Sequence, residues 1–387
     1  NAMCSPCRAS VLTGMMPSAH GIHNWLDDNL ENFWPDNWNA IGEFENLPSQ
    51  LKKHGYINAI IGKYHLGKAW KSPLAFDHWV TFPHGHTKSF YNNQIIDNNK
   101  NYHYEGHSVE FFTQKTVDFL KEQERSSKPF FCFVPFNGPY GHWPSIKGRS
   151  DNKFANLYDN CELTSVPREG INKRVIDRYN FRILENKGNL PEQFLGPLLL
   201  PNNKESLRNY FSQTSLIDHG IGRILNELKS LKLFENTIII YTSDHGFSLG
   251  NHGIWGHGLA AWPSSIHRPS FNIPLIFSGP GIKRGISNSL VSQLDLSNTI
   301  LNLAEIDSLN GKWVDSRSID MSNEKDEKRT MIYMEQEETR AIRTKDWLYM
   351  ERFNINKMPK LDPELYNLKK DPDEREDLSN NKKYFSV

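Results

Sequence analysis

Four short stretches of the chain combine reactive side chains with the glycines and prolines that position them. The first is CSPCR at residues 4–8, followed by LTG at residues 12–14. A cysteine thiolate is a strong nucleophile, and an arginine one helical turn away presents a fork of N–H donors that suits an oxyanion. Cys4 and Cys7 also have the spacing of zinc and redox sites, but no second CxxC or nearby histidine pair completes a four-ligand site. The segment therefore indicates cysteine-centred chemistry more than zinc binding.

The other three stretches follow predicted strands. GKYHLG at residues 62–67 comes after the apolar run 57–61 and carries Lys63 and His65. TSDHG at residues 242–246 ends the run 237–241, and NGPYGHWP at residues 137–144 ends the run 130–136. Ligand sites in open α/β sheets gather at the carboxyl ends of strands, so we expect these stretches to lie near one another.

The segment at residues 4–14 resembles the signature of the type I, formylglycine-dependent sulfatases of the alkaline phosphatase superfamily. In that family CxPxR and the LTG element direct a maturation enzyme to oxidise the first cysteine to formylglycine, whose hydrated aldehyde is the nucleophile. The resemblance implies that Cys4 is this residue and that Arg8 polarises the diol, while Cys7 stands where Ser or Ala is usual. A diol suits the reaction because one hydroxyl attacks sulfur while the alcohol of the ester departs. The second hydroxyl then loses its proton, so that the aldehyde re-forms and sulfate leaves.

Two further stretches resemble catalytic elements of the family. Residues 62–67 are similar to its GKWHLG element, with Tyr64 in place of Trp, which implies that Lys63 binds a sulfate oxygen and His65 takes a proton from the diol. The segment after residue 136 resembles a PHxP-like element that supplies the acid for the leaving oxygen. Tyr140 follows Pro139 directly, where His is common, whereas His142 has the downstream proline. We expect His142 to be the acid.

Residues 242–258 resemble the family's SDHG or SDNG metal element and the LWGK element that follows it. This implies Asp244 and His245 as ligands of a divalent cation, commonly calcium, although imidazole is a soft ligand for calcium. His257 stands in place of the usual Lys and is cationic only when protonated, which predicts an activity optimum at lower pH. An aromatic and imidazole-rich set suits a sugar ring, with core packing as the alternative role. Its members are Trp255, His257 and His86, which we expect to bind substrate, and also Trp25, His84, Trp143 and Trp262.

Family members carry two consecutive Asp residues at the end of a strand upstream of the cysteine signature, and these complete the carboxylates around the cation. The pair Asp27 and Asp28 lies downstream instead, in a stretch similar to the family's HGIHDWL loop, so we expect it to line the pocket and not to bind the cation. A chain limited to residues 1–387 is therefore expected to be metal-poor and weakly active or inactive. A protein that includes the upstream strand is expected to be active.

These stretches need a scaffold, and the apolar pattern supplies one. Buried-type strands at 57–61, 130–136, 237–241 and 274–277 alternate with a helical stripe from Leu207 to Leu228. The fold class expected from this and from the resemblance is alkaline-phosphatase-like α/β, with a large, mostly parallel central sheet flanked by helices. Residues 145–205 show little sustained period and are predicted to form a surface excursion.

The pattern changes near residue 330. Short polar-alternating strands are predicted at residues 331–335, 339–343 and 347–352, before a charged tail. These segments are similar to the family's RAVRTxxWKY strand pair and its ELYDLxxDPxExxNL ending. We therefore expect a catalytic domain over residues 1–330, lacking its N-terminal strand, and a C-terminal subdomain with a short antiparallel sheet over residues 331–387.

Composition narrows the classes of partner. The 45 basic residues balance the 45 acidic ones, so no net charge favours nucleic acid or an anionic membrane surface. Four cysteines in 387 residues are too few for a disulfide framework, and no apolar run has the length of a spanning helix. We expect neither nucleic acid nor membrane as a partner.

The resemblance implies a sulfuric ester hydrolase that acts on a sulfated carbohydrate, is matured by a formylglycine-generating enzyme, and works in the periplasm or outside a bacterial cell. Two alternatives remain open at this point. A phosphonate or phosphate ester hydrolase of the same superfamily needs the same metal, diol and cationic contacts. A degenerate sulfatase-like binding protein is the other, and the joint presence of Cys4, Arg8, Lys63 and His65 speaks against it.

Overall fold

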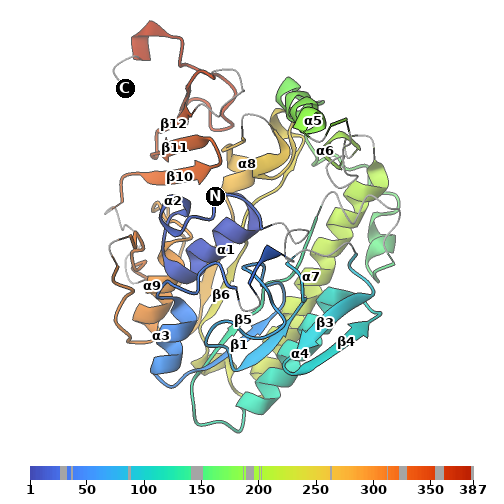
Figure 1. Ribbon diagram of the computed structural model, residues 1–387, viewed down its shortest axis with the longest axis vertical. Coiled ribbons are helices and arrows are strands. Elements are labelled where there is room, and N and C mark those ends of the chain that lie inside the picture. The colour runs from blue at the N-terminus through green and yellow to red at the C-terminus, as the bar shows by residue number, and fades with distance from the viewer. Residues whose placement is uncertain are drawn as a thin grey trace.

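The computed structural model describes residues 1–26, 33–35, 38–85, 89–140, 151–185, 187–188, 196–199, 201, 203–261, 264–311, 313–321, 329–353 and 361–384. Within these ranges the chain forms an α/β body with a small antiparallel sheet near its C-terminal end (Figure 1). Among the described residues, no helix is long and apolar enough to cross a membrane. Several residues singled out above fall outside these ranges, namely Asp27, Asp28, His86, His142, Trp143 and Trp262.

The larger sheet has the strand order β4-β3-β2-β1-β5. β1 (Ile57–Ile61) lies between β2 (His78–Thr81) and β5 (Phe130–Phe133) and runs parallel to both. β3 (Asn93–Asp97) and β4 (Lys100–Tyr104) add an antiparallel hairpin beside β2. The α/β fold class is confirmed, and the sheet is mixed because this hairpin, whose turn uses Asn98 at φ 54°, extends it.

The predicted strands at 237–241 and 274–277 are β6 (Ile239–Thr242) and β9 (Leu275–Ser278). They pair antiparallel in a two-stranded sheet of their own, and among the described strands none links this pair to the larger sheet. Another short antiparallel pair follows β6 and consists of β7 (Ser248–Leu249) and β8 (Trp255–Gly256).

Helices cover both faces of the larger sheet (Figure 1). On one face α4 (Ser108–Gln123) and the long α7 (Lys204–Ser230) pack against each other, and the predicted stripe from Leu207 to Leu228 lies in α7. On the other face lie α1 (Cys4–Thr13), α3 (Leu47–Lys53) and α9 (Asp295–Leu303).

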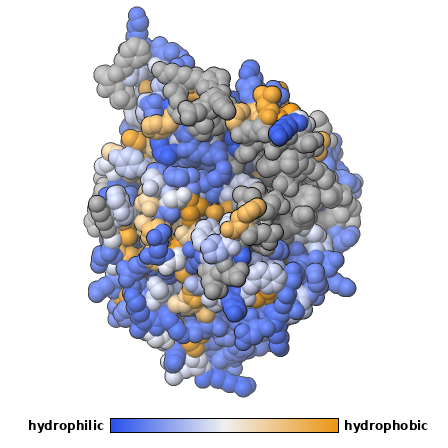
Figure 2. Space-filling view, in the orientation of Figure 1, coloured by the Kyte–Doolittle hydropathy of each residue, from blue (hydrophilic) through white to orange (hydrophobic). Residues whose placement is uncertain are grey.

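Strand β1 is apolar except at Asn58 because it is buried on both faces. Its side chains alternate between the two faces, so that Ala59 and Ile61 join the cluster under α4 and α7 while Ile60 joins the opposite cluster. All three are almost completely buried. In the orientation of Figure 1, Figure 2 shows mostly hydrophilic residues over the lower rim of this face and a patch of hydrophobic ones near its centre.

The expectation for residues 145–205 is wrong in one respect, because this excursion contains helix α5 (Lys173–Glu185). Val175 and Tyr179 lie one turn apart on α5 and pack with Ile254, Ala260 and Ala261. Charged residues surround these two positions in the sequence, so the helical spacing of the apolar residues is not apparent there. The remaining short helices are α2 (Pro17–His20), α6 (Gly196–Leu199), α8 (Arg268–Phe271) and the 3₁₀ turns Ala155–Tyr158, Phe234–Asn236, Asn251–Gly253, Gly258–Ala260 and Lys382–Tyr384.

The C-terminal sheet has four antiparallel strands in chain order, β10 (Ile332–Gln336), β11 (Thr339–Arg343), β12 (Trp347–Arg352) and β13 (Glu364–Asn367). The three predicted strands are confirmed to within one residue, and β13 was not predicted as a strand. β13 pairs antiparallel with β12, and a buried ion pair between Arg352 and Glu364, 2.6 Å apart, also joins these two strands. The boundary near residue 330 stays a prediction.

Candidate active site

Cys4 begins helix α1 and lies at the meeting point of three other segments. Its side chain is buried, and its Sγ is 3.2 Å from Tyr140 Oη, 3.3 Å from Lys63 Nζ and 3.6 Å from His245 Nε2. Pro6 fits the first turn of α1 because an N–H there has no partner within the helix. The helix ends at Gly14, whose φ of 68° closes its last turn and where a Cβ would collide with Ser316.

The surroundings of Cys4 favour its thiolate. Burial alone raises the pKa of a thiol, yet the ammonium of Lys63 and hydrogen bonds from His245 and His65 lower the pKa of Cys4 well below its usual value. Cys7 shows the opposite, because burial raises its pKa to about 12. Two cysteines three positions apart therefore have pKa values that are shifted in opposite directions.

The end of β1 delivers Lys63 and His65 to this place, as the sequence predicts. Gly62 is required at the end of the strand, because a Cβ there would lie 2.2 Å from the carbonyl oxygen of Pro135 at a φ of 148°. The Lys63 N–H donates to that same carbonyl at 2.8 Å. Both side chains are buried, and His65 Nε2 is 2.9 Å from the carbonyl oxygen of Leu26.

Tyr140 is the residue that the sequence argument set aside. Its hydroxyl contacts Cys4 Sγ at 3.2 Å and Lys63 Nζ at 3.3 Å, and its N–H donates to Gln213 Oε1 at 3.1 Å. Burial and the neighbouring Cys4 raise the pKa of Tyr140 well above its usual value, so the phenol keeps its proton. The signal for it was its place directly after Pro139. Because His142 lies outside the described residues, its role as the acid stays a prediction.

Asp244 and His245 follow β6 and close the site from the other side. Asp244 Oδ2 accepts from the Arg8 guanidinium at 2.9 Å, and Arg8 also donates to the carbonyl oxygen of Lys63. Burial opposes the charge of Asp244, but His245 and Arg8 hold its pKa below the usual value. Burial likewise opposes protonation of His245, but Asp244 and Cys4 raise its pKa to about 9. The site is therefore a network of alternating charges.

The two described residues that were predicted to bind substrate, Trp255 and His257, lie in different surroundings. The ring of His257 lies beside that of His245, with centroids 4.7 Å apart, so His257 borders the site. Trp255 does not, since its side chain is fully buried among Leu163, Val166 and Leu207 and its indole N–H donates to the carbonyl oxygen of Gly170. This placement corrects the expectation for Trp255 and gives it the packing role. His86 lies outside the described residues.

Few donor atoms for a cation lie around Cys4 in the described part of the chain. Cys4, Asp244 and His245 each offer a ligand atom, and these atoms lie within 4.8 Å of one another. The set contains one carboxylate, whose Oδ2 is already bonded to Arg8, together with an imidazole and a sulfur. Calcium takes six to eight oxygen ligands, so the described residues alone do not fit it.

Two other features of the described chain lie apart from Cys4. His252, His267 and Glu374 also approach one another, but Glu374 accepts from Arg343 at 2.6 Å and from His267 at 3.0 Å, so its charge is already compensated.

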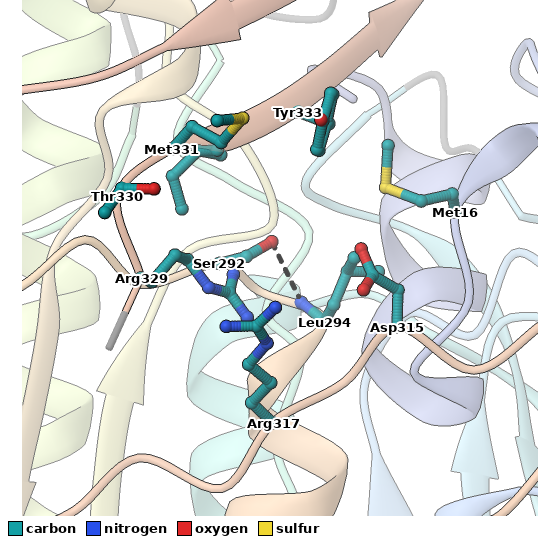
Figure 3. Close-up of a pocket in the computed structure, with 10 residues that line it drawn as sticks. Met16, Ser292, Leu294, Asp315, Arg317, Arg329, Thr330, Met331 and Tyr333 are labelled. Atoms are coloured by element: carbon teal, nitrogen blue, oxygen red, sulfur yellow. Dashed lines mark hydrogen bonds between the residues drawn. The ribbon is translucent and has the colours of Figure 1, made fainter. Parts of the chain in front are cut away.

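A cavity of about 240 Å³ lies between the start of α9 and β10 (Figure 3). It contains none of the residues around Cys4 and is lined by Met16, Ser292, Leu294, Asp315, Arg317, Arg329, Thr330, Met331, Ile332 and Tyr333.

Several solved protein structures have a fold similar to that of this chain. A protein called BT4656, solved in complex with its substrate D-glucosamine-2-N,6-O-disulfate, aligns over 100% of this chain and 85% of its own, with a TM-score of 0.68 and 24% identity. The PsFucS1 sulfatase from Pseudoalteromonas sp. aligns over 97% of this chain and 76% of its own, with a TM-score of 0.63 and 18% identity. At these identities the likeness shows the alkaline-phosphatase-like fold alone.

Proteins named as sulfatases are also similar to this chain in sequence. The N-acetylglucosamine-6-O-sulfatase of Bacteroides thetaiotaomicron is 27% identical over 359 residues, covering 79% of this chain and 60% of that protein. The choline-sulfatase of Rhizobium meliloti is 25% identical over 424 residues, covering 98% and 73%. The chain spans 60% or less of the length of several such relatives, among them the bovine N-acetylglucosamine-6-sulfatase at 55%.

Family models cover the whole chain between them. The model of the N-sulphoglucosamine sulphohydrolase C-terminal region matches residues 260–387. The sulfatase model matches residues 1–306, which include Cys4, Lys63, Tyr140 and Asp244. The chain belongs to the sulfatase family.

Proposed function

We propose that this chain carries the catalytic site of a sulfuric ester hydrolase that cleaves sulfate monoesters of a carbohydrate. The observation that carries the proposal is the convergence of Lys63, Tyr140 and His245 within 3.6 Å of the Cys4 sulfur. These groups come from the segments that follow β1, β5 and β6, and together they offer cationic and hydroxyl contacts to an oxyanion. Membership of the sulfatase family supports the same reaction.

The surroundings of Cys4 also fit its oxidised form. An ammonium, a phenol and an imidazole within hydrogen-bonding reach of Sγ would serve the two hydroxyl groups of a hydrated aldehyde as well as they serve a thiolate. Formylglycine at this position would supply the oxygen nucleophile, made from Cys4 by a maturation enzyme.

The other residues would then bind and move protons. Lys63 holds an oxygen at the reacting centre, because its Nζ contacts both Cys4 and Tyr140 at 3.3 Å. His245 donates from Nδ1 to the Gly246 carbonyl oxygen at 2.8 Å and faces residue 4 through Nε2. Burial opposes its protonation, but Asp244 and Cys4 raise its pKa to about 9, so its second proton lies on Nε2, toward residue 4. Tyr140 donates from a phenol that stays protonated, and Arg8 is held in line by Asp244.

For the cation we propose calcium with Asp244 as a ligand and His245 beside it. Asp244 is the one carboxylate in the described cluster, so the remaining oxygen ligands would come from outside the described residues. No role of Lys63, Tyr140 or His245 given above depends on this ion.

The substrate proposed is a sulfated sugar. The named relatives support this choice, since they include N-acetylglucosamine-6-sulfatases and an iduronate 2-sulfatase. Bacterial and extracellular sulfatases both occur among the relatives, which supports a periplasmic or extracellular place of action. His257 at the border of the site is the described side chain that we propose to contact the sugar.

Turnover by the matured protein tests the proposal. The chain, together with any residues that precede Asn1 in its gene, is produced with a formylglycine-generating enzyme and assayed on aryl sulfate, aryl phosphodiester and a panel of sulfated saccharides. We expect sulfate esters to be preferred and Cys4→Ala to abolish their turnover. Preferred turnover of the phosphodiester would establish the alternative hydrolase, and sugar binding without any turnover would establish a binding protein.

A further inference from the structure

Gln293 lies in the loop before α9 and uses its whole amide on the active-site segments. Its Nε2 donates to the backbone carbonyl oxygens of Ser243 and Asp244, at 2.5 and 2.9 Å. Its Oε1 accepts from the thiol of Cys7. The Cys7 thiol also lies against the Asp244 carbonyl oxygen, so Cys7 and Gln293 meet at the same peptide.

The chemistry of these partners fixes the orientation of the amide. Two carbonyl oxygens face one end of Gln293, so that end must be the NH₂ group, and the oxygen must then face a donor. Cys7 is that donor, because its buried thiol lies against the Gln293 Oε1 atom and can donate its S–H to it. Cys7 is a donor here and not a second nucleophile.

The bridge joins two elements that must be in register for the reaction. Cys7 lies one turn after Cys4 on α1, and residues 243–244 form the turn after β6 that presents Asp244 and His245. The Arg8 and Asp244 side chains link the same two elements at 2.9 Å, but that link holds a carboxylate whose side chain is 23% exposed. Gln293 instead holds the backbone of the same turn, through the carbonyl oxygens of Ser243 and Asp244.

We propose that Cys7 and Gln293 are positioning residues, which fix the Asp244–His245 turn relative to residue 4 through the Cys7–Gln293–Asp244 bridge. This inference rests on the proposed function only for its effect on rate. A misplacement of about 1 Å at a catalytic group can cost on the order of a hundredfold in rate.

Four variants of the matured, complete protein test it. Gln293→Ala removes all three bonds, Cys7→Ala removes the donor, and Cys7→Ser restores a donor of similar size. Asn298→Ala is the matched control, because Asn298 is buried on α9 and its amide likewise bridges two backbone groups, the Ser316 carbonyl at 3.2 Å and the Leu309 N–H at 2.7 Å, away from Cys4.

We expect Gln293→Ala to lower kcat by about ten- to a hundredfold and Cys7→Ala by about tenfold, with KM nearly unchanged. Cys7→Ser should recover most of the rate, and Asn298→Ala should lose stability but not kcat. Hydrogen exchange over residues 243–247 should rise in Gln293→Ala and not in Asn298→Ala, a readout that needs no turnover.

The outcomes separate the two proposals. If the parent protein turns over no sulfate ester, the proposed function fails, and the exchange data alone then decide the bridge. Unchanged exchange over residues 243–247 in Gln293→Ala overturns the inference. Equal loss of kcat in Gln293→Ala and Asn298→Ala overturns it as well, because both variants would then act through stability.

Discussion

The ammonium of Lys63 lies 3.3 Å from the sulfur of Cys4, although 59 residues separate them in the chain. Helix α1 supplies one partner and the end of β1 the other, and both side chains are buried. A cation against a buried thiol lowers the pKa of that thiol, and the same contact suits an oxygen of a sulfate ester.

The first prediction concerns the ionisation of Cys4 in protein that has not been matured. Because Lys63 and His245 favour its thiolate, Cys4 should react with iodoacetamide at neutral pH, whereas Cys7 and Cys132, whose pKa values burial raises to about 12, should not. Lys63→Met should shift the midpoint of Cys4 alkylation to higher pH. Peptide mass spectrometry across pH measures this, with Lys115→Met, at a remote ion pair with Asp97, as the control. Equal labelling of Cys4 and Cys7 would contradict it.

The second prediction concerns the buried pair of Arg8 and Asp244. Arg8 donates to both Asp244 and the Lys63 carbonyl, and a lysine cannot reproduce that fork. Arg8→Lys should therefore lower kcat/KM by on the order of a hundredfold, and Arg8→Met should cost about 3 kcal/mol of stability by leaving Asp244 uncompensated. A double-mutant cycle with Asp244→Asn measures the coupling. If the double variant is no more stable than the sum of the singles predicts, the pair is not coupled.

The third prediction concerns acid unfolding. Burial opposes the charge of Glu374, but His267 and Arg343 lower its pKa from 4.5 to about 2. A depressed carboxyl pKa stabilises the fold above pH 4.5, and this contribution, on the order of 3 kcal/mol, is lost as pH falls from 4.5 toward 2. Glu374→Gln should lower stability at pH 7 and flatten its dependence on pH in urea unfolding between pH 3 and 7. The exposed neighbour Glu376→Gln should behave like the parent, and a parallel curve for Glu374→Gln would refute the assignment.

The fourth prediction concerns Gly62. An alanine there would place its Cβ 2.2 Å from the Pro135 carbonyl oxygen, so β1 and the end of β5 would have to separate beneath Lys63. Gly55→Ala is the control, since Gly55 also has a positive φ, 84°, but nothing within 4 Å of the added atom. Both variants place an L residue at a positive φ, which costs about 1–2 kcal/mol, and the close approach should make Gly62→Ala cost at least about 2 kcal/mol more. Thermal unfolding measures the difference, and equal losses would show that the close approach carries no cost.

The fifth prediction concerns the pH dependence of turnover. His257 stands where the family has Lys and lies beside His245, so a positive charge there depends on protonation. Sulfate ester hydrolysis should fall from pH 5 to 8, and His257→Lys should make the decline shallower because lysine stays charged over this range. A flat profile in the parent protein would count against the role of His257.

Most of the scaffold of this site was predictable from the sequence, because it depends on local pattern. The apolar run at residues 57–61 is β1 and ends at the glycine that delivers Lys63 and His65. The stripe from Leu207 to Leu228 is α7, and three C-terminal strands have nearly the predicted bounds.

The rest depends on contacts between distant segments. Tyr140 belongs to the site because its hydroxyl contacts the side chains of Cys4 and Lys63. The residues next to Tyr140 in the sequence do not reveal these contacts. Trp255 is aromatic and adjacent to the metal element, yet Leu163, Val166 and Leu207 enclose it. The bridge from Cys7 to Gln293 spans 286 residues and has no local signal at all.

The proposed function requires that residue 4 is oxidised to formylglycine and takes the sulfuryl group. Tandem mass spectrometry of the peptide that contains residues 4–8, from protein made in its own host and shown to hydrolyse a sulfate ester, tests it most directly. We predict formylglycine at position 4 and loss of turnover in Cys4→Ala. An unmodified cysteine there in fully active protein would contradict the account.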